Sequence, residues 1–232
     1  RIIGTVSNIH DKKTAEDKLI KAVMRTQISA VIRGKDAERK RIAADLHDGL
    51  GQMLTVASLE LDSLMSALNG SSKVTKKKIE DALNLINKAI DETRAISHDL
   101  MPASLEDFGL QSSILHLVNG VNSKSSTKFK FYENTVTKRF SEDIEMNLFR
   151  ITQECIQNIL KHAHAKNGVI QLIQHEDSII LMVEDDGVGY DPSTSHDGLG
   201  VKNIQNRVAA LDGKLNFDSS KKGTVITVEI ML

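Results

Sequence analysis

The sequence is poor in cysteine, proline and aromatic residues. It has one cysteine, Cys155, so no disulfide can form within the chain, which fits a reducing compartment. It has no tryptophan, aromatic residues make up 3% of the chain, and 30 basic residues nearly balance 31 acidic ones. The chain therefore lacks both the base-stacking side chains and the basic excess that are typical of nucleic-acid-binding proteins. We expect no nucleic-acid partner.

Long apolar runs are also missing. No run approaches the roughly 18 residues that a membrane span requires, and no signal peptide is visible. The sequence begins at Arg1 rather than at methionine. We therefore expect a cytoplasmic fragment without a membrane segment, whose parent protein can still be anchored in a membrane.

The first part of the chain has the pattern of long helices. Residues 14–69 contain no proline, and apolar residues within 42–68 recur at spacings of three and four, which is one stripe on a helix. The segment 69–72 is a turn signal, and a second helix over about 74–100 ends before Pro102. Two such helices cannot bury their stripes alone, so we predict a homodimer in which two helical hairpins form a four-helix bundle.

After Pro102 the pattern becomes mixed. We predict helices over 109–122, 141–163 and 201–211, and strands over 128–135, 167–174, 179–184, 215–218 and 224–231. Residues 1–10 are predicted to form a short strand as well. The fold class is therefore α+β: a helical hairpin that forms a dimeric four-helix bundle, followed by an α/β sandwich.

Several polar residues of the second part suit a nucleotide. Glu154 and Asn158 lie four residues apart on one face of a helix, and the amide oxygen of Asn158 suits Mg²⁺. Lys161 and His162 follow, where they can meet phosphates. On its own, such a face is more often simply solvated. The strand ending at Asp185 then supplies a carboxylate that can accept a hydrogen bond from an amino group such as that of adenine.

Glycines accompany this carboxylate. Gly187 and Gly189 follow Asp185 and allow a close approach of the backbone to a ligand. Gly198, Leu199 and Gly200 stand directly before a helix, where backbone N–H groups form an anion site. Gly223 and Thr224 open the last strand; by themselves they are an ordinary hairpin turn.

These four segments, in this order, resemble the N, G1, G2 and G3 boxes of the GHKL ATPases over roughly residues 141–232. The resemblance implies that ATP binds here, that Asp185 contacts the adenine amino group, and that Asn158 holds Mg²⁺. It also implies that residues of about 190–199 form a lid over the nucleotide.

A second constellation lies on the first helix. His47 flanks the apolar stripe, whereas Asp48 and Gln52 are predicted to point away from it. An isolated helical histidine is usually structural, but Gly49 and Gly51 are unfavourable in a helix interior by about 1 kcal/mol each relative to alanine, and they can admit a partner surface. An adjacent carboxylate can also hold one ring nitrogen protonated and leave the other nucleophilic.

Residues 38–48, read as ERKRIAADLHD, resemble the H box of the nitrate-sensor-like and DesK-like histidine kinases. The resemblance implies that His47 accepts the γ-phosphoryl group through Nε2, and that Asp48 orients or deprotonates the ring. It further implies that Gln52 orients water against the phospho-aspartate of a response regulator. Met101, Pro102, Leu105, Gly109 and Leu110 are similar to the interdomain linker of this branch.

The resulting domain prediction has four parts. Residues 1–13 resemble the end of a PAS sensor domain, which implies an upstream PAS domain in the parent chain; 14–40 form a helical signal linker; 41–102 form the dimerisation and phosphotransfer domain; and 103–232 bind ATP. The predicted activity is an ATP-dependent protein-histidine kinase with ATP and Mg²⁺ as cofactors and a receiver domain as partner. The alternatives are another GHKL-type ATPase, a non-catalytic dimeric scaffold, and a family member in which phosphatase activity dominates.

Overall fold

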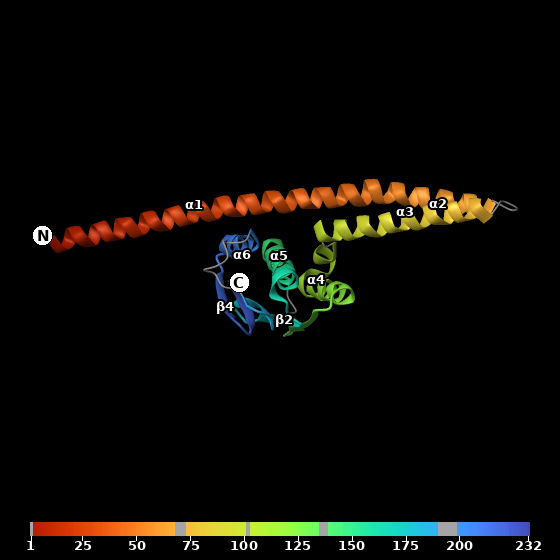
Figure 1. Ribbon diagram of the computed structural model, residues 1–232. Helices are drawn as coiled ribbons and strands as arrows, with labels where there is room; N and C mark the ends of the chain where they lie inside the picture. Colours follow the sequence, from red (N-terminus) through yellow and green to blue (C-terminus); the bar gives the residue numbers. More distant parts are fainter. Residues whose placement is uncertain (1, 68–72, 101–102, 135–138, 190–198) are drawn as a thin grey trace. The chain divides into compact units, whose positions relative to one another are not determined.

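The computed structural model describes residues 2–67, 73–100, 103–134, 139–189 and 199–232 (Figure 1). The chain divides into two compact units. One consists of Arg33–Ala103, and the other combines Ser104–Leu232 with Arg1–Ile32. Each is described by itself below.

The first unit is helical. It contains the end of α1 (Ile2–Asp45), a π-helical segment η1 (Leu46–Gly51), α2 (Gln52–Ala67) and α3 (Lys73–Leu100). Helices α2 and α3 pack against each other as a hairpin (Figure 1). The predicted helices are therefore confirmed, with one interruption: the sequence pattern indicated an unbroken helix, whereas six residues around His47 adopt the wider π-helical turn.

The predicted strand over residues 1–10 is wrong. Residues 2–10 belong to α1, which runs on without a break to Asp45. A strand requires a hydrogen-bonded neighbour, and the described strands of the sheet all come from the region after residue 127. The upstream PAS domain and the four domain boundaries stay predictions.

The second unit is built around a mixed sheet of five strands. They are β1 (Lys128–Glu133), β2 (Asn167–Gln174), β3 (Ser178–Asp185), β4 (Lys214–Ser220) and β5 (Gly223–Met231). Their order is β1-β2-β3-β5-β4; β1 and β2 are parallel and the other neighbours are antiparallel. The five predicted strands are all present, with small shifts at their ends.

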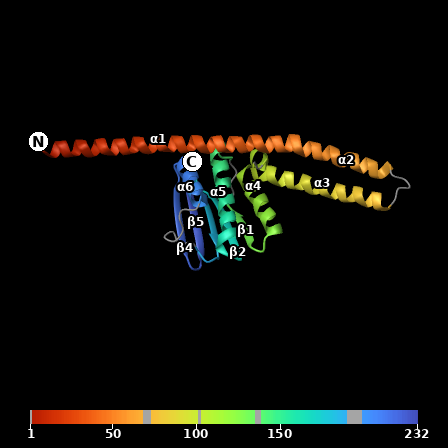
Figure 2. The same cartoon turned by 45° about the horizontal axis from the view of Figure 1, so that its top comes forward.

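Helices cover one face of this sheet (Figures 1 and 2). They are α4 (Ala103–Lys124), which has a kink at Gly109, α5 (Glu142–Asn158) with the π-helical η2 (Ile159–Ala163), and α6 (Leu199–Ala210). Fully buried side chains of α5, among them Leu148 and Ile151, join Ile170 and Leu172 of β2 in the core. This arrangement confirms the predicted α/β sandwich.

A serine side chain caps the N-terminus of α5. The Ser141 side chain accepts a hydrogen bond from the backbone N–H of Ile144, and three acidic residues occupy the first turn, where they interact favourably with the helix dipole. This cap fixes where α5 begins, and therefore which of its residues face the core and which stand at its polar edge.

Among the helices of the described part of the chain, none combines the length and the apolar composition needed to cross a membrane.

Candidate functional site

His47 lies on the exposed side of the π-helical turn η1. Its side chain is 72% exposed, and its Nδ1 atom is 2.9 Å from Oδ1 of Asp48. When Asp48 accepts the Nδ1 proton, the lone pair of the ring is on Nε2. The geometry therefore presents an accessible imidazole whose second nitrogen is free to act as a nucleophile.

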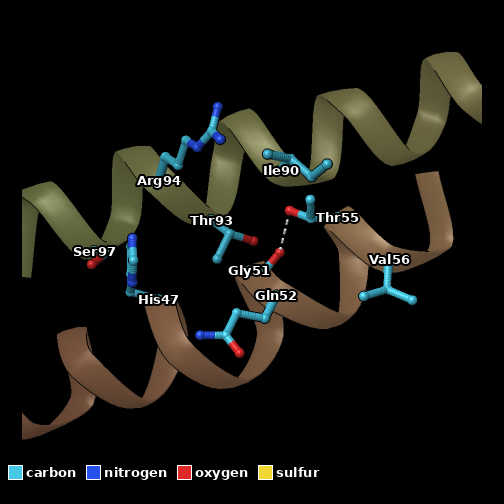
Figure 3. A pocket seen from close by; sticks show the side chains of 9 residues that line it. All are labelled: His47, Gly51, Gln52, Thr55, Val56, Ile90, Thr93, Arg94 and Ser97. Carbon is cyan, nitrogen blue, oxygen red and sulfur yellow. Dashed lines mark hydrogen bonds between the residues drawn. The ribbon is translucent and has the colours of Figure 1, made fainter. Parts of the chain in front are cut away.

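A groove of about 330 Å³ runs beside this histidine, between the segment η1–α2 and helix α3 (Figure 3). His47 and Gln52 line it from one side, and Thr93, Arg94 and Ser97 line it from the other. Polar side chains of two helices thus border one shallow site that includes the imidazole.

Gln52 is exposed, as expected of a residue predicted to point away from the apolar stripe, and it lines the same groove as His47. In an α-helix, residues five apart point about 140° away from each other, because each residue turns the chain by about 100°. A π-helix closes its turn over five residues instead. The π-helical segment therefore places His47 and Gln52, five residues apart, along the same groove.

Sequence reasoning missed the contribution of α3 to this groove. Arg94 and Ser97 lie 47 and 50 residues after His47, and no spacing rule connects them to it. The Ser97 hydroxyl donates a hydrogen bond of 3.0 Å to the carbonyl oxygen of Ala43, just before the π-helical segment. Only the packing of the two helices reveals this connection.

In the second unit, the predicted polar face of α5 meets the start of α6. A Cβ atom on Gly200 would collide with Oε1 of Glu154 and would lie 3.1 Å from Oδ1 of Asn158. Only glycine therefore allows the N-terminal turn of α6 to approach these two side chains so closely. The first turn of a helix carries N–H groups without partners inside the helix, so this junction brings anion-binding and oxygen-donor groups together.

Asp185 stands at the end of β3, largely buried. Burial raises the pKa of its carboxyl group, and hydrogen bonds from the backbone N–H groups of Gly187 and Thr224 oppose this shift. The Gly187 N–H lies 2.8 Å from Oδ1. A buried carboxylate with one oxygen held in this way suits an amino group that enters the site.

Glycines bring the surrounding loops close to Asp185. A Cβ atom on Gly187 would collide with the carbonyl oxygen of Ala163, at the end of η2. A Cβ atom on Gly223 would collide with the carbonyl oxygen of Asp185 itself. The predicted G1 and G3 segments therefore meet at one corner of the sheet.

Asp186 supports this corner and was not singled out from the sequence. Its carboxylate accepts hydrogen bonds from the backbone N–H groups of Lys166 and Asn167 and from the side-chain amide of Asn167, at 2.7 to 2.8 Å. These bonds lower the pKa of Asp186, those from Asn167 most strongly. Asp186 thus ties the end of β3 to the beginning of β2.

The remaining predicted residues are placed as follows. Lys161 and His162 lie exposed on η2, directly after the polar face of α5. Gly189 ends the described part of the G1 loop and has a positive φ of 77°. Gly198 and most of the predicted lid lie outside the described residues, and Leu199 is the first residue of α6.

The donor set at the α5–α6 junction fits a magnesium ion. The cradle around Gly200 presents a carboxylate oxygen of Glu154 and the amide oxygen of Asn158. Mg²⁺ prefers such oxygen ligands and usually keeps several waters while it binds substrate phosphates. Asn158 is thus a suitable ligand for an ion that enters with a nucleotide.

Comparison with protein families gives two matches. A model described as "Histidine kinase" (HisKA_3) matches residues 38–105, and a model described as "Histidine kinase-, DNA gyrase B-, and HSP90-like ATPase" (HATPase_c) matches residues 143–232. Together they cover more than half of the chain. The first includes His47 and its groove, and the second includes Asn158, Asp185 and Gly200.

Three curated relatives are similar in sequence to most of this chain. The chain is 29% identical over 232 residues to the oxygen sensor histidine kinase NreB of Staphylococcus carnosus. This match covers 97% of this chain and 65% of the relative. It is 31% identical over 206 residues to the sensor histidine kinase ComP of Bacillus subtilis, a match that covers 85% of this chain and 27% of the relative. It is 28% identical over 222 residues to the sensor histidine kinase MctS of Rhizobium johnstonii, a match that covers 94% of this chain and 47% of the relative.

The chain thus spans between about a quarter and two thirds of the length of these relatives. The match to the histidine kinase model argues against the alternative of another GHKL-type ATPase, because it covers the helical hairpin that precedes the ATPase unit. With an H-box hairpin followed by a GHKL-type ATPase domain, the chain belongs to the sensor histidine kinases, in the nitrate-sensor-like and DesK-like branch.

Proposed function

We propose that this chain is the catalytic core of a two-component sensor kinase that transfers the γ-phosphoryl group of ATP to its own His47. The observation that carries the proposal is the exposed imidazole whose Nδ1 is hydrogen bonded to Asp48. Nε2 attacks the γ-phosphorus, the bond to the β–γ bridging oxygen breaks, and ADP leaves. As positive charge develops on the ring, the Asp48 carboxylate stabilises or accepts the Nδ1 proton.

The nucleotide binds to the second unit in this proposal. Asp185 accepts a hydrogen bond from the adenine amino group, and the N-terminal turn of α6 faces the phosphates. Asn158, with Glu154 beside it, holds Mg²⁺, which neutralises charge on the phosphates when it is bound. Lys161 and His162 add positive or hydrogen-bonding groups at the same end of α5. The close junction at Gly200 and the buried carboxylate at the end of β3 support these roles.

We further propose that the chain acts as a homodimer. In a single copy, large apolar side chains of the hairpin are exposed to solvent, among them Leu50, Met53, Val56, Leu64, Leu85 and Ile96. Burying such stripes contributes roughly 25 cal/mol per Å². A second hairpin that completes a four-helix bundle covers them.

The phosphoryl group then passes to an aspartate of a response regulator receiver domain. Gln52 lies on the same groove as His47, which supports a second role in which its amide orients water against the phosphorylated regulator. Kinase and phosphatase reactions would thus share one docking site. An upstream PAS domain and a cytoplasmic location of this part of the parent protein complete the proposal.

The test is incubation with Mg²⁺ and ATP labelled in the γ-phosphate. We expect the wild-type chain to take up label that is acid-labile and base-stable, as a phosphohistidine is, and the variant His47→Gln to take up none. Equal labelling of both would refute the assignment of His47. A nucleotide titration checks that the variant still binds ATP, which separates loss of the acceptor from loss of the nucleotide site.

A further inference from the structure

Ser97 of α3 has an unusual hydrogen bond for a helical serine. Hydroxyl groups inside helices commonly bond to the carbonyl four residues earlier in the same helix. Thr55, Ser66 and Thr93 of the same unit do so. The Ser97 hydroxyl instead donates across to the carbonyl oxygen of Ala43, 54 residues away in α1, at 3.0 Å.

The acceptor of this bond, the carbonyl oxygen of Ala43, lies just before the π-helical segment. Ala43 is 5% exposed and belongs to the last α-helical turn before η1 begins at Leu46. A helical carbonyl points toward the residue four positions later, which for Ala43 is His47. Ser97 and His47 also line the same groove (Figure 3). The hydrogen bond therefore holds the turn from which the imidazole projects.

The segment at His47 adopts a π-helical register, to which an α-helical register is the alternative. An α-helical turn and a π-helical turn differ in which carbonyl each N–H group reaches, and a shift of one residue changes a side chain's direction by about 100°. A Cβ atom on Gly49 would meet nothing within 4 Å, and one on Gly51 would meet only the carbonyl oxygen of Leu46, at 3.5 Å, so side-chain packing at these two positions does not fix the register. A contact that holds the backbone just before this segment is needed if the side chain of His47 is to keep one direction.

We propose that Ser97 is a positioning residue for the kinase reaction. Its hydroxyl fixes the Ala43 turn against α3, so that the π-helical segment starts at one residue and His47 projects along the groove. The inference rests on the proposed function, because it assigns a role in phosphoryl transfer to His47. Ser97 itself does not touch the reacting atoms; it acts through the backbone of α1.

If Ser97 positions His47, loss of its hydroxyl should lower kcat and leave KM for ATP unchanged. ATP binds to the second unit, so loss of the Ser97 hydroxyl should leave KM for ATP within about twofold of wild type. A misplaced acceptor lowers the rate of the chemical step, and displacement by about 1 Å can reduce a rate by about 100-fold. We expect Ser97→Ala to lower kcat for labelling of His47 by tenfold or more.

Two further variants make the test specific. Ser97→Thr keeps a hydroxyl at the same position and should restore most of the lost kcat. Ser58→Ala is the matched control: it removes the hydrogen bond of 3.3 Å from Ser58 of α2 to Asn87 of α3 in the same hairpin, away from His47. Ser58→Ala should keep wild-type kcat. All variants are compared as dimers of the full chain, with Mg²⁺ and γ-labelled ATP.

The outcomes separate the two proposals. If the wild-type chain labels no histidine, the proposed function fails. If it labels His47 but Ser97→Ala keeps wild-type kcat, if Ser58→Ala loses as much activity as Ser97→Ala, or if Ser97→Thr stays as slow as the alanine variant, the positioning role of Ser97 is overturned. A fall in kcat with unchanged KM, rescued by threonine, supports it.

Discussion

Nδ1 of His47 and Oδ1 of Asp48 are 2.9 Å apart, although neighbouring residues of a regular α-helix point about 100° away from each other. The pair lies inside η1, the π-helical turn that interrupts the long first helix. Both side chains are mostly exposed, so a partner domain can reach the ring. A carboxylate can only accept, so this contact favours the tautomer with the proton on Nδ1, and the exposure leaves Nε2 available.

Replacing Asp48 by asparagine should therefore slow autophosphorylation. The amide can still accept a hydrogen bond from the ring, but it has no charge to stabilise the positive ring in the transition state. We expect kcat to fall by about 100-fold, in the range typical of general acid–base groups, with KM for ATP unchanged. Initial rates of labelling measure both. Asp45→Asn is the control, because Asp45 forms an exposed ion pair with Arg41 instead; wild-type rates for Asp48→Asn would contradict the role.

Replacing Gln52 by alanine should separate two activities. The proposed role of this amide is to orient water against the phosphorylated regulator, and it takes no part in the attack of His47 on ATP. Gln52→Ala should therefore keep labelling of His47 within about twofold and lower the rate of regulator dephosphorylation by tenfold or more. The measurement follows loss of label from a purified phospho-regulator. Parallel loss of both activities would indicate a general disturbance of the groove instead.

Much of this architecture could be predicted because it depends on local periodicity. The stripe on the first helix, the apolar-rich segments of β2 and β3, and the Ser141 cap follow from neighbouring residues alone. The segment 1–10 misled because Ile2, Ile3 and Val6 favour strands, a weak preference that context overrides. The π-helical turn has no comparable sequence signal, and the hydrogen bond from Ser97 to Ala43 depends on how two distant helices pack.

The nucleotide site shows the same division. The order of its motifs predicts that the segments of Asn158, Asp185 and Gly200 lie together, and the structure brings Gly200 close to Asn158. The binding roles of these residues stay predictions. The support that Asp186 gives to β2 depends on strand pairing, in which Gly168 stands opposite Asp185, and the sequence does not specify that register. Motifs therefore indicate candidate binding residues, whereas residues that hold a loop in place, such as Asp186, are visible only in the fold.

Asp185→Asn should abolish nucleotide binding without weakening the fold. In wild type the backbone N–H groups of Gly187 and Thr224 donate to this carboxyl group, that of Gly187 to Oδ1, and the proposed adenine contact uses Oδ2. In the variant the amide oxygen keeps the bond to Gly187, so the NH₂ group faces the adenine amino group, donor against donor. We expect ATP affinity to fall by 100-fold or more, measured by calorimetric titration; retention of wild-type affinity would refute the adenine contact.

The difference in stability between Asp185→Asn and wild type should also depend on pH. Because burial raises the pKa of Asp185, the folded protein binds more protons than the unfolded chain just above the ordinary aspartate pKa. Stability from this group therefore falls as pH rises through that window. Without nucleotide, Asp185→Asn should be at least as stable as wild type at about pH 7, and the difference should shrink toward about pH 4. Thermal unfolding curves at both pH values give the comparison; a variant less stable at neutral pH would contradict it.

Gly200→Ala tests whether the junction of α5 and α6 is a binding site or only a packing contact. The new Cβ atom would displace the ends of Glu154 and Asn158, which are flexible side chains, so the fold should persist. Alanine also favours a helix over glycine by about 1 kcal/mol. We therefore expect an unchanged or higher Tm without nucleotide, together with a loss of ATP affinity of tenfold or more.

Gly120→Ala supplies the matched control for this change. Gly120 lies in α4, where an added Cβ atom would meet nothing within 4 Å. The same substitution there should raise stability by up to about 1 kcal/mol and leave ATP affinity as in wild type. If Gly200→Ala also keeps its affinity, the oxygens of Glu154 and Asn158 do not contribute to nucleotide binding. A loss confined to Gly200→Ala places the Mg²⁺–phosphate end of the nucleotide at this junction, because only there does the added methyl group reach the oxygen ligands.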